Sequence, residues 1–262
     1  MKCILKLADN EYPYTYINHV RKEQEMNILL TNDDGYNSQG ILLLKELLEP
    51  YGTVVICAPS GPMSAKSVSI TLGKGIKVEK VEKNVYKCDG TPADCVSFAL
   101  NTMNEKFDLV VSGCNHGFNI SYDTMYSGTI GAALEALRNH TPSIAVSVEH
   151  NFELVRNHFK EVFHYILKEK LLSEEYLLNI NFPLGDEVKG MKIATLYYRN
   201  DQYYFIKKED GYWAYRNTQT DFSDDKESDC YLVNHGYISI TPLNKTYFSH
   251  EIYQKINNKN EK

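Results

Sequence analysis

Short runs of apolar residues alternate with helical patterns between residue 26 and about residue 150. Apolar runs of this length that lack a polar face predict strands buried on both sides. Four such runs stand in this part of the chain, at 27–31, 54–58, 107–112 and 143–148. Buried strands that alternate with helices are typical of a parallel sheet covered by helices on both faces. The pattern therefore predicts an α/β fold with a mostly parallel, Rossmann-like sheet.

Helix start signals lie between these runs. Thr91 suits an N-cap, Pro92 suits the first helical position, and Asp94 can complete a capping box. A second helix should begin near Gly128, and a longer one should cover about 151–170.

The pattern changes after residue 170. One more buried strand is predicted at 178–182 and a last strand at 237–241. Between them, three short strands with polar turns are predicted at 193–198, 202–206 and 212–216. We interpret this Tyr-rich stretch, about 190–235, as an antiparallel β-arm for contact between subunits, although an ordinary β-meander is the alternative.

Three segments make up the predicted organisation. Residues 1–25 are polar and Tyr-rich and are interpreted as an N-terminal extension, with an ordinary first hairpin as the alternative. Residues 26–245 should form a single α/β domain, and 246–262 a polar C-terminal tail.

Composition narrows the functional classes. The net charge of −6 disfavours sequence-independent binding to nucleic acids, which depends on Lys and Arg neutralising phosphates. No apolar run approaches the roughly 20 residues that span a bilayer, and the N-terminus lacks a secretory signal pattern. The six cysteines include no C-x-x-C pair, so we expect reduced core thiols and a cytoplasmic protein.

The strongest chemical signal is Asn32-Asp33-Asp34-Gly35, which follows the first buried strand. In a parallel α/β sheet, ligands bind at the carboxyl ends of the strands. Two adjacent carboxylates repel each other there, and a divalent cation such as Mg²⁺ or Mn²⁺ would relieve that repulsion. The alternative is a plain Asx turn, for which this composition is also suited.

Two further loops belong to the same predicted sheet edge. Ser64 stands in a hydroxyl-rich loop after the second run and could add a ligand. After the third run, Asn115 and Asn119 offer amide groups. The stretch 127–129, Ser-Gly-Thr, brings hydroxyls and backbone N–H groups to a helix start, which suits an anion, although simple N-capping is the alternative.

Taken in order, these blocks resemble the SurE family of survival-protein nucleotidases over about residues 26–243. The matching stretches are 32–35, 58–59 with Ser64, 69–71, 90–94, 112–119, 126–129 and 236–243. The resemblance implies a Rossmann-like core with a β-arm and swapped C-terminal segments that build homodimers or homotetramers. It also implies a metal-dependent phosphatase acting on nucleoside 5′-monophosphates, on 3′-monophosphates, and in some members on polyphosphate.

Residue roles follow from the same resemblance. One divalent ion per subunit would be bound by Asp33, Asp34, Ser64 and Asn115. The phosphate would lie against Asn119, Ser127, Gly128 and Thr129. Asp33, Asp34 and Asn119 are therefore the candidate catalytic residues.

The mechanism remains open between two routes at this stage. We favour direct attack by a metal-activated water, with Asp34 orienting that water and Asp33 acting as a ligand. An aspartyl-phosphate on Asp33 is the alternative. A non-catalytic nucleotide-binding or interaction protein on the same fold is a second class of function. A dinucleotide-binding oxidoreductase is disfavoured because no G-x-G-x-x-G follows the first strand.

Two positions depart from the family pattern. Ala65 stands where a glycine is frequent, which predicts a stiffer loop, and His116 stands where a small or apolar residue is common. We interpret His116 as a neutral neighbour rather than a catalytic acid. Tyr36, Phe118 and Tyr126 could face a base, but each is more typical of packing and receives no role.

Overall fold

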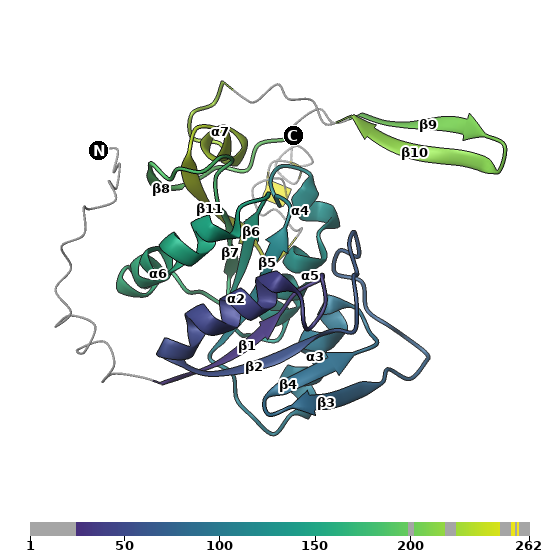
Figure 1. Cartoon of the computed structure of the whole chain (residues 1–262), viewed down its shortest axis with the longest axis vertical. Helices are drawn as coiled ribbons and strands as arrows, with labels where there is room; N and C mark the ends of the chain where they lie inside the picture. The colour runs from purple at the N-terminus through teal and green to yellow at the C-terminus, as the bar shows by residue number, and fades with distance from the viewer. Residues whose placement is uncertain (1–24, 199–201, 218–223, 247–252, 255, 257–262) are drawn as a thin grey trace.

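The structure is a computed structural model that describes residues 25–198, 202–217, 224–246, 253–254 and 256 (Figure 1). The predicted extension, apart from its last residue, lies outside the described residues. So does most of the predicted polar tail, with the expected C-terminal swap.

A nine-stranded mixed sheet forms the centre of the described chain. In spatial order its strands are β3 (Val78–Glu82), β4 (Val85–Cys88), β2 (Gly52–Pro59), β1 (Met26–Thr31), β5 (Leu109–His116), β6 (Ser143–Val148), β7 (Tyr176–Asn181), β11 (Tyr237–Asn244) and β8 (Gly190–Ile193). All neighbours pair in parallel except β3 with β4 and β11 with β7. The predicted mostly parallel α/β fold is confirmed.

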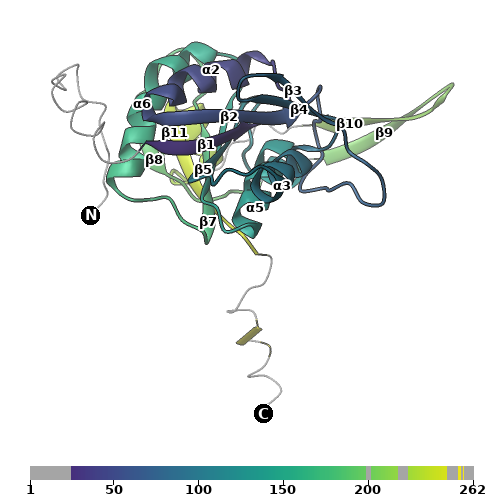
Figure 2. The ribbon, with the colours of Figure 1, turned by 90° about the horizontal axis from the view of Figure 1, so that it is seen from below.

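Helices cover both faces of this sheet, as the view from below shows (Figure 2). The helices are α2 (Gln39–Leu48), the 3₁₀ helix η1 (Glu49–Tyr51), α3 (Pro92–Thr102), α4 (Asp123–Tyr126), α5 (Gly128–Arg138), α6 (Phe152–Lys168) and α7 (Asp229–Asn234). α2 and α6 pack on the face that carries Ile28 and Leu30 of β1. α3 and α5 pack on the opposite face, around Leu29. Alternate residues of one strand thus enter two cores, which is why the apolar runs are continuous.

The predicted helix starts are confirmed at atomic detail. Thr91 and Asp94 form a reciprocal capping box at the start of α3. Ser127 caps α5 by accepting from Ile130 N. Both signals are local in sequence, which is why they could be recognised without a fold.

Strand order creates a crevice next to β1. The chain passes from β1 through α2 to β2 on one side, whereas β5 lies on the other side of β1. Such a switch point lets the loops after two neighbouring strands separate, and it is where ligands bind in open α/β sheets.

Some predicted elements were wrong, and some elements of the structure were not predicted. The strand predicted at 193–198 is not there; β8 instead occupies 190–193 and pairs with β11. After Ala194 the backbone leaves β11, and Thr195 bonds to the segment before α7 instead. β5 runs on through His116, although the sequence predicted a loop after Ser112. The short strands β3 and β4 and the helix α7 were not predicted, because none has a long hydrophobic pattern.

The predicted antiparallel arm is present as β9 (Gln202–Lys208) and β10 (Gly211–Asn217). This hairpin extends away from the body of the molecule (Figures 1 and 2). Its exposed apolar side chains include Phe205, Tyr212 and Trp213.

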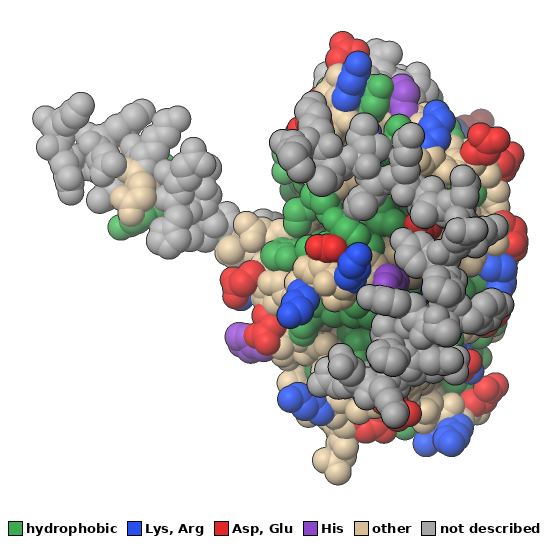
Figure 3. Space-filling model, turned by 90° about the vertical axis from the view of Figure 1, so that its left-hand side faces the viewer, with side chains coloured by type: hydrophobic (Ala, Val, Ile, Leu, Met, Phe, Trp, Pro, Cys, Tyr) green, Lys and Arg blue, Asp and Glu red, His purple; other side chains and the backbone are tan. Residues whose placement is uncertain are grey.

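The described surface has mixed charge. On the face shown in Figure 3, Lys and Arg side chains are interspersed with Asp and Glu. Within the described parts of the chain, no helix combines the length and apolar character needed to cross a membrane.

Candidate functional site

The turn between β1 and α2 presents two adjacent carboxyl groups at the sheet edge. Asn32 fixes this turn: its Oδ1 accepts from Gly35 N at 3.0 Å, and its Nδ2 donates to Gly35 O and to Ser38 Oγ. Gly35 has a φ of +114°, a conformation that favours glycine. The Asx-turn interpretation is thus correct for Asn32, and it leaves Asp33 and Asp34 available for other partners.

Asp33 is the buried member of the pair, with 4% of its surface exposed. Thr129 Oγ1, at the start of α5, donates to Asp33 Oδ1 at 2.6 Å. Met63 N donates to Asp33 O at 2.7 Å. Burial raises the pKa of Asp33 to about 6, and the charge of Asp34 adds to this, while the Thr129 hydrogen bond opposes it.

Asp34 is the more accessible member. Its Oδ2 accepts a long hydrogen bond, 3.4 Å, from His116 N at the end of β5. Burial raises the pKa of Asp34 as well, against the opposing effect of this N–H group. Two neighbouring carboxyl groups that both resist ionisation form a site where a cation would be stabilised.

Ser64 and Asn115 are the other two predicted metal ligands. Asn115 lies beside His116, and its Nδ2 donates to Gly117 O, which leaves the amide oxygen outside that bond. Ser64 is exposed and follows Met63, whose N–H contacts Asp33, but no hydrogen bond joins Ser64 to either aspartate. The structure thus brings the backbones of three loops together, while it gives no direct contact for the Ser64 side chain.

The oxygen donors present suit a hard divalent cation. In the described residues, no three His, Cys, Asp or Glu side chains gather in a way that could hold a metal. An ion here would therefore need neutral oxygens, water or substrate besides the two aspartates, which is the donor set that Mg²⁺ and Mn²⁺ accept. The residues present fit such an ion.

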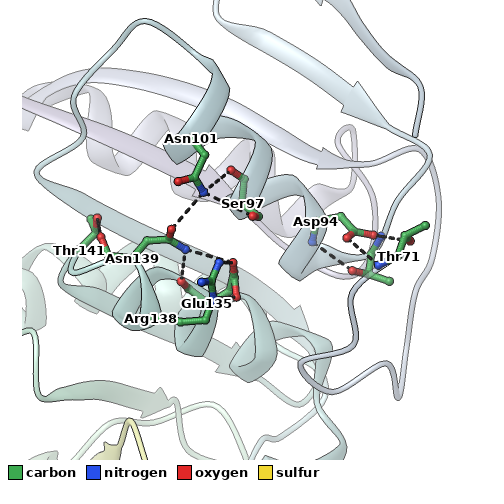
Figure 4. Close-up of polar contacts among 9 residues, drawn as sticks. Thr71, Asp94, Ser97, Asn101, Glu135, Arg138, Asn139 and Thr141 are labelled. Atoms are coloured by element: carbon green, nitrogen blue, oxygen red, sulfur yellow. Dashed lines mark hydrogen bonds and ion pairs between the residues drawn. The ribbon is translucent and has the colours of Figure 1, made fainter. Parts of the chain in front are cut away.

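The loop that carries Ser64 is fastened to two helices. Ser67 N and Oγ donate to the carbonyls of Tyr126 and Met125, just before α5. Asp94 of α3 accepts from Thr71 N at 2.9 Å and from Thr71 Oγ1 at 2.7 Å (Figure 4). These hydrogen bonds place the loop against the ends of α3 and α5.

The start of α5 lies directly against Asp33. A Cβ on Gly128 would come within 2.8 Å of Asp33 Cβ and 2.9 Å of its Oδ2, so only glycine fits there without a shift. Ser127 acts as the N-cap, as the simpler interpretation expected, but it accepts in that bond and its hydroxyl can still donate. The Thr129 hydroxyl donates to Asp33, and its backbone N–H also acts on that carboxylate and lowers the Asp33 pKa, so in this arrangement Thr129 orients Asp33.

Asn119 is 4% exposed and is held by a buried polar network. Asn181 Oδ1 accepts from Asn119 N, and Asn179 Nδ2 and Asn181 Nδ2 both donate to Asn119 O. Asn119 Nδ2 donates to Ser147 Oγ at 2.9 Å.

Three of these partners, Ser147, Asn179 and Asn181, were not recognised from the sequence. Two asparagines spaced by two residues within the buried strand β7 were the available signal, because alternate residues share one face.

Comparison with known proteins identifies the family. The model of the family "Survival protein SurE" matches residues 28–202. The chain belongs to the SurE family. "5'-nucleotidase SurE" of Campylobacter lari is 39% identical over 235 residues, which cover 82% of this chain and 91% of the relative. The protein of the same name from Mannheimia succiniciproducens is 38% identical over 232 residues, covering 83% and 92%.

A solved structure of the SurE family has the same architecture. The crystal structure of the SurE protein from Aquifex aeolicus superposes with a TM-score of 0.77 at 32% identity, and the match covers 88% of this chain and 98% of that one. The predicted family and fold class are confirmed.

The backbone geometry at position 65, where this SurE chain departs from the family pattern, explains why glycine is frequent there. Ala65 has a φ of +57°, in the left-handed region that favours glycine, as does Ser67 at +52°. A glycine at position 65 would adopt this conformation without steric cost. We therefore attribute the frequent glycine to the backbone rather than to the ligand chemistry.

Proposed function

We propose that this chain is a divalent-metal-dependent 5′-nucleotidase that hydrolyses nucleoside 5′-monophosphates to nucleoside and phosphate. Relatives that match most of the chain are named 5′-nucleotidase SurE. The observation that carries the proposal is the meeting of Asp33 and Asp34 with the start of α5 at one sheet edge. Activity on 3′-monophosphates and polyphosphate is included on the family resemblance alone.

One Mg²⁺ or Mn²⁺ per subunit would be bound by Asp33, Asp34, Ser64 and Asn115. A bound ion of this kind lowers the pKa of a coordinated water and offsets charge on phosphoryl oxygens. The raised pKa of both aspartates supports the assignment, because their ionised forms need a positive charge nearby.

The two aspartates have different surroundings, which supports different roles. Asp33 is buried and bonded to Thr129, so its carboxylate is fixed in orientation and suited to be a ligand. Asp34 is half-buried beside an open cleft, so its carboxylate can reach a water and accept its proton.

The phosphate would lie at the start of α5. Backbone N–H groups at a helix N-terminus favour an anion, and Ser127 can add its hydroxyl. Asn119 keeps one amide hydrogen beyond its bond to Ser147, which it can donate to a phosphoryl oxygen. These groups would position the substrate and stabilise the charge that develops on its oxygens.

The decisive experiment is phosphate release from AMP, GMP, CMP, UMP, 3′-AMP and polyphosphate, each with Mg²⁺, with Mn²⁺ and with chelator. We expect release from the 5′-monophosphates with metal and its loss with chelator. No release from any substrate, together with measurable AMP binding, would support the non-catalytic alternative.

Single turnover in ¹⁸O-water separates the two chemical routes. Attack by water places the label in phosphate and none in the protein. An aspartyl-phosphate on Asp33 would instead leave label in that carboxyl group after hydrolysis at carbon, or yield a trappable phosphoenzyme.

We also propose that the chain forms a homodimer or a homotetramer. Phe205 is 67% exposed, Tyr212 69% and Trp213 49%, all on the projecting β9–β10 hairpin. A hairpin of two strands has no core of its own, so such side chains are stabilised by contact with another subunit. Light scattering after size exclusion should show a dimer or tetramer, and a Phe205→Ser and Trp213→Ser double variant should shift it to a smaller species.

We also propose a cytoplasmic location. Cys57, Cys88, Cys95 and Cys114 are buried free thiols, which fits a reducing compartment. Localisation of a tagged chain in cell fractions tests this.

A further inference from the structure

A cleft opens beside Asp34, on the side of the sheet edge away from α5. Its volume is about 510 Å³. Three loops form it: the turn after β1, the end of β5 and the turn between β6 and α6. The side chains that matter for its chemistry are Asp34, Gln39, His116, His150 and Phe152.

The backbones of α2 and β5 pack closely beside the cleft. Gly40, near the start of α2, lines the cleft, and a Cβ there would lie 1.9 Å from Cys114 O of β5. The absence of a side chain at Gly40 lets α2 rest directly on β5. This position is also the switch point of the sheet.

Three rings face one another around this space. The ring centroids of His116 and Phe152 are 5.9 Å apart, and their planes are inclined by 33°. The centroids of His150 and His116 are 6.1 Å apart, in an edge-to-face arrangement. His116 and His150 are exposed and Phe152 is half-buried, and all three line the cleft, so a ligand in the cleft can contact these side chains.

The polar groups at the cleft complement these rings. Gln39, at the first position of α2, is exposed and carries an amide that can both donate and accept. Aromatic faces with a few polar groups at the edge are the surroundings that a nucleobase needs.

The cleft and the proposed phosphate site lie on opposite faces of the sheet edge. α5 belongs to the face around Leu29, whereas α2 and α6, which border the cleft, belong to the face around Leu30. Asp33 contacts Thr129 of α5, and Asp34 lines the cleft that α2 and α6 border. A ligand with an anionic group at one end and a flat ring at the other would span the pair of aspartates.

We propose that this cleft binds the nucleobase of the substrate, with Phe152 and His116 as stacking faces and Gln39 at the base edge. The proposal rests on the proposed nucleotidase function and extends it by assigning a specificity site. It also differs from the aromatic residues first considered, since Tyr36 and Phe118 pack against core clusters.

The test compares AMP with ribose 5-phosphate, which carries the same phosphate ester without a base. Steady-state rates are measured for the wild type, Phe152→Ala and Phe152→Tyr, and for Phe98→Ala as a matched control. Phe98 is a half-buried phenylalanine of α3, on the other face of the sheet. Phe152→Leu, which keeps most of the volume, replaces Phe152→Ala if the latter fails to fold.

Loss of one stacking face should raise KM for AMP by about tenfold in Phe152→Ala, with kcat changed by less than about twofold. KM for ribose 5-phosphate should stay within about twofold, and Phe152→Tyr should restore AMP binding. Gln39→Ala should change the ratio of kcat/KM between AMP and CMP. Adenosine should inhibit the wild type competitively, and Phe152→Ala should lose that inhibition.

The failures are distinguishable. If the wild type releases phosphate from neither compound, the nucleotidase proposal is wrong. If the wild type is active but Phe152→Ala raises KM equally for AMP and ribose 5-phosphate, or for neither, the cleft does not bind the base.

Discussion

The two halves of the candidate site differ in burial, although the residues at their centre are neighbours in sequence. Asp33 is 4% exposed and bonded to Thr129, and Asn119, assigned to the same half, is held by three buried side chains. Asp34 faces a cleft and has one long hydrogen bond to His116 N. One half is therefore fixed before any ligand arrives, and the other half remains open to water and substrate.

This difference in burial shows how a phosphatase site can assign charge stabilisation and proton exchange to different residues. Groups that stabilise charge are most effective when they are preorganised and shielded from water. A group that must exchange protons with a water needs access to solvent. The alternation of burial between Asp33 and Asp34 meets both needs within one turn of the chain.

The largest expected effect tests the open half. Asp34→Asn should lower kcat for AMP by at least ~10²-fold with the fold intact, on the scale of positioned catalytic groups. Phosphate release and thermal unfolding measured together check this. Near-full activity of Asp34→Asn would contradict the assignment. Glu46→Gln serves as an exposed control because its carboxylate pairs with Arg156 at the surface.

The second effect tests the buried half through pH. The pKa of Asp33 is about 6 in the folded protein and 3.8 as its ordinary value. Asp33 therefore contributes fully to the free energy of unfolding below pH 3.8, where it is protonated in both states. As the pH rises through 6 the buried carboxyl group ionises, and the free energy of unfolding of the metal-free protein falls by about 3 kcal/mol. Urea unfolding between pH 4 and 8 measures this loss.

Asp33→Asn is the control for that measurement, since it removes the titrating group and keeps the shape. The difference in unfolding free energy between wild type and variant should change with pH across this window. Added Mn²⁺ should stabilise the wild type at pH 8 but the variant much less. A pH-independent difference would show that burial does not destabilise the ionised Asp33.

The third effect concerns the contact between the buried half and α5. Gly128→Ala should lower kcat/KM by about tenfold to a hundredfold, because the new Cβ would meet Asp33 at 2.8 Å and displace it. Gly61→Ala is the matched control, since a Cβ there meets nothing within 4 Å. Equal activities in both variants would mean that Asp33 can move without cost.

The smallest effect concerns the loop that carries Ser64, which hydrogen bonds fasten to α3 and to the residues before α5, beside the buried half. Ala65→Gly should raise the free energy of unfolding by about 0.5–1 kcal/mol. The left-handed backbone strain that glycine removes, about 1–2 kcal/mol, exceeds the conformational entropy that it adds to the unfolded chain, about 0.5–1 kcal/mol. Chemical denaturation of the two proteins checks the sign. A loss of stability would show that the loop is not strained at this residue.

Local signals explain most of what could be predicted. The capping box at Thr91, the N-cap at Ser127 and the Asx turn at Asn32 each depend on a few adjacent residues. The family resemblance brought Asp33, Asp34 and Gly128 into one hypothesis. The strand predicted at 193–198 was wrong because the backbone at Thr195 bonds to a segment 30 or more residues further along the chain, and β3 and β4 were too short to be recognised.

The sequence by itself determined which groups stand at the ends of the strands, because turns and caps are fixed by local backbone chemistry. Only the tertiary structure decided how buried each group is and which distant partner it has. Thr129 lies 96 residues beyond Asp33, and the cleft beside Asp34 is bounded by three separate loops. Burial and long-range hydrogen bonds depend on how whole elements pack, and this packing gives two adjacent aspartates different surroundings.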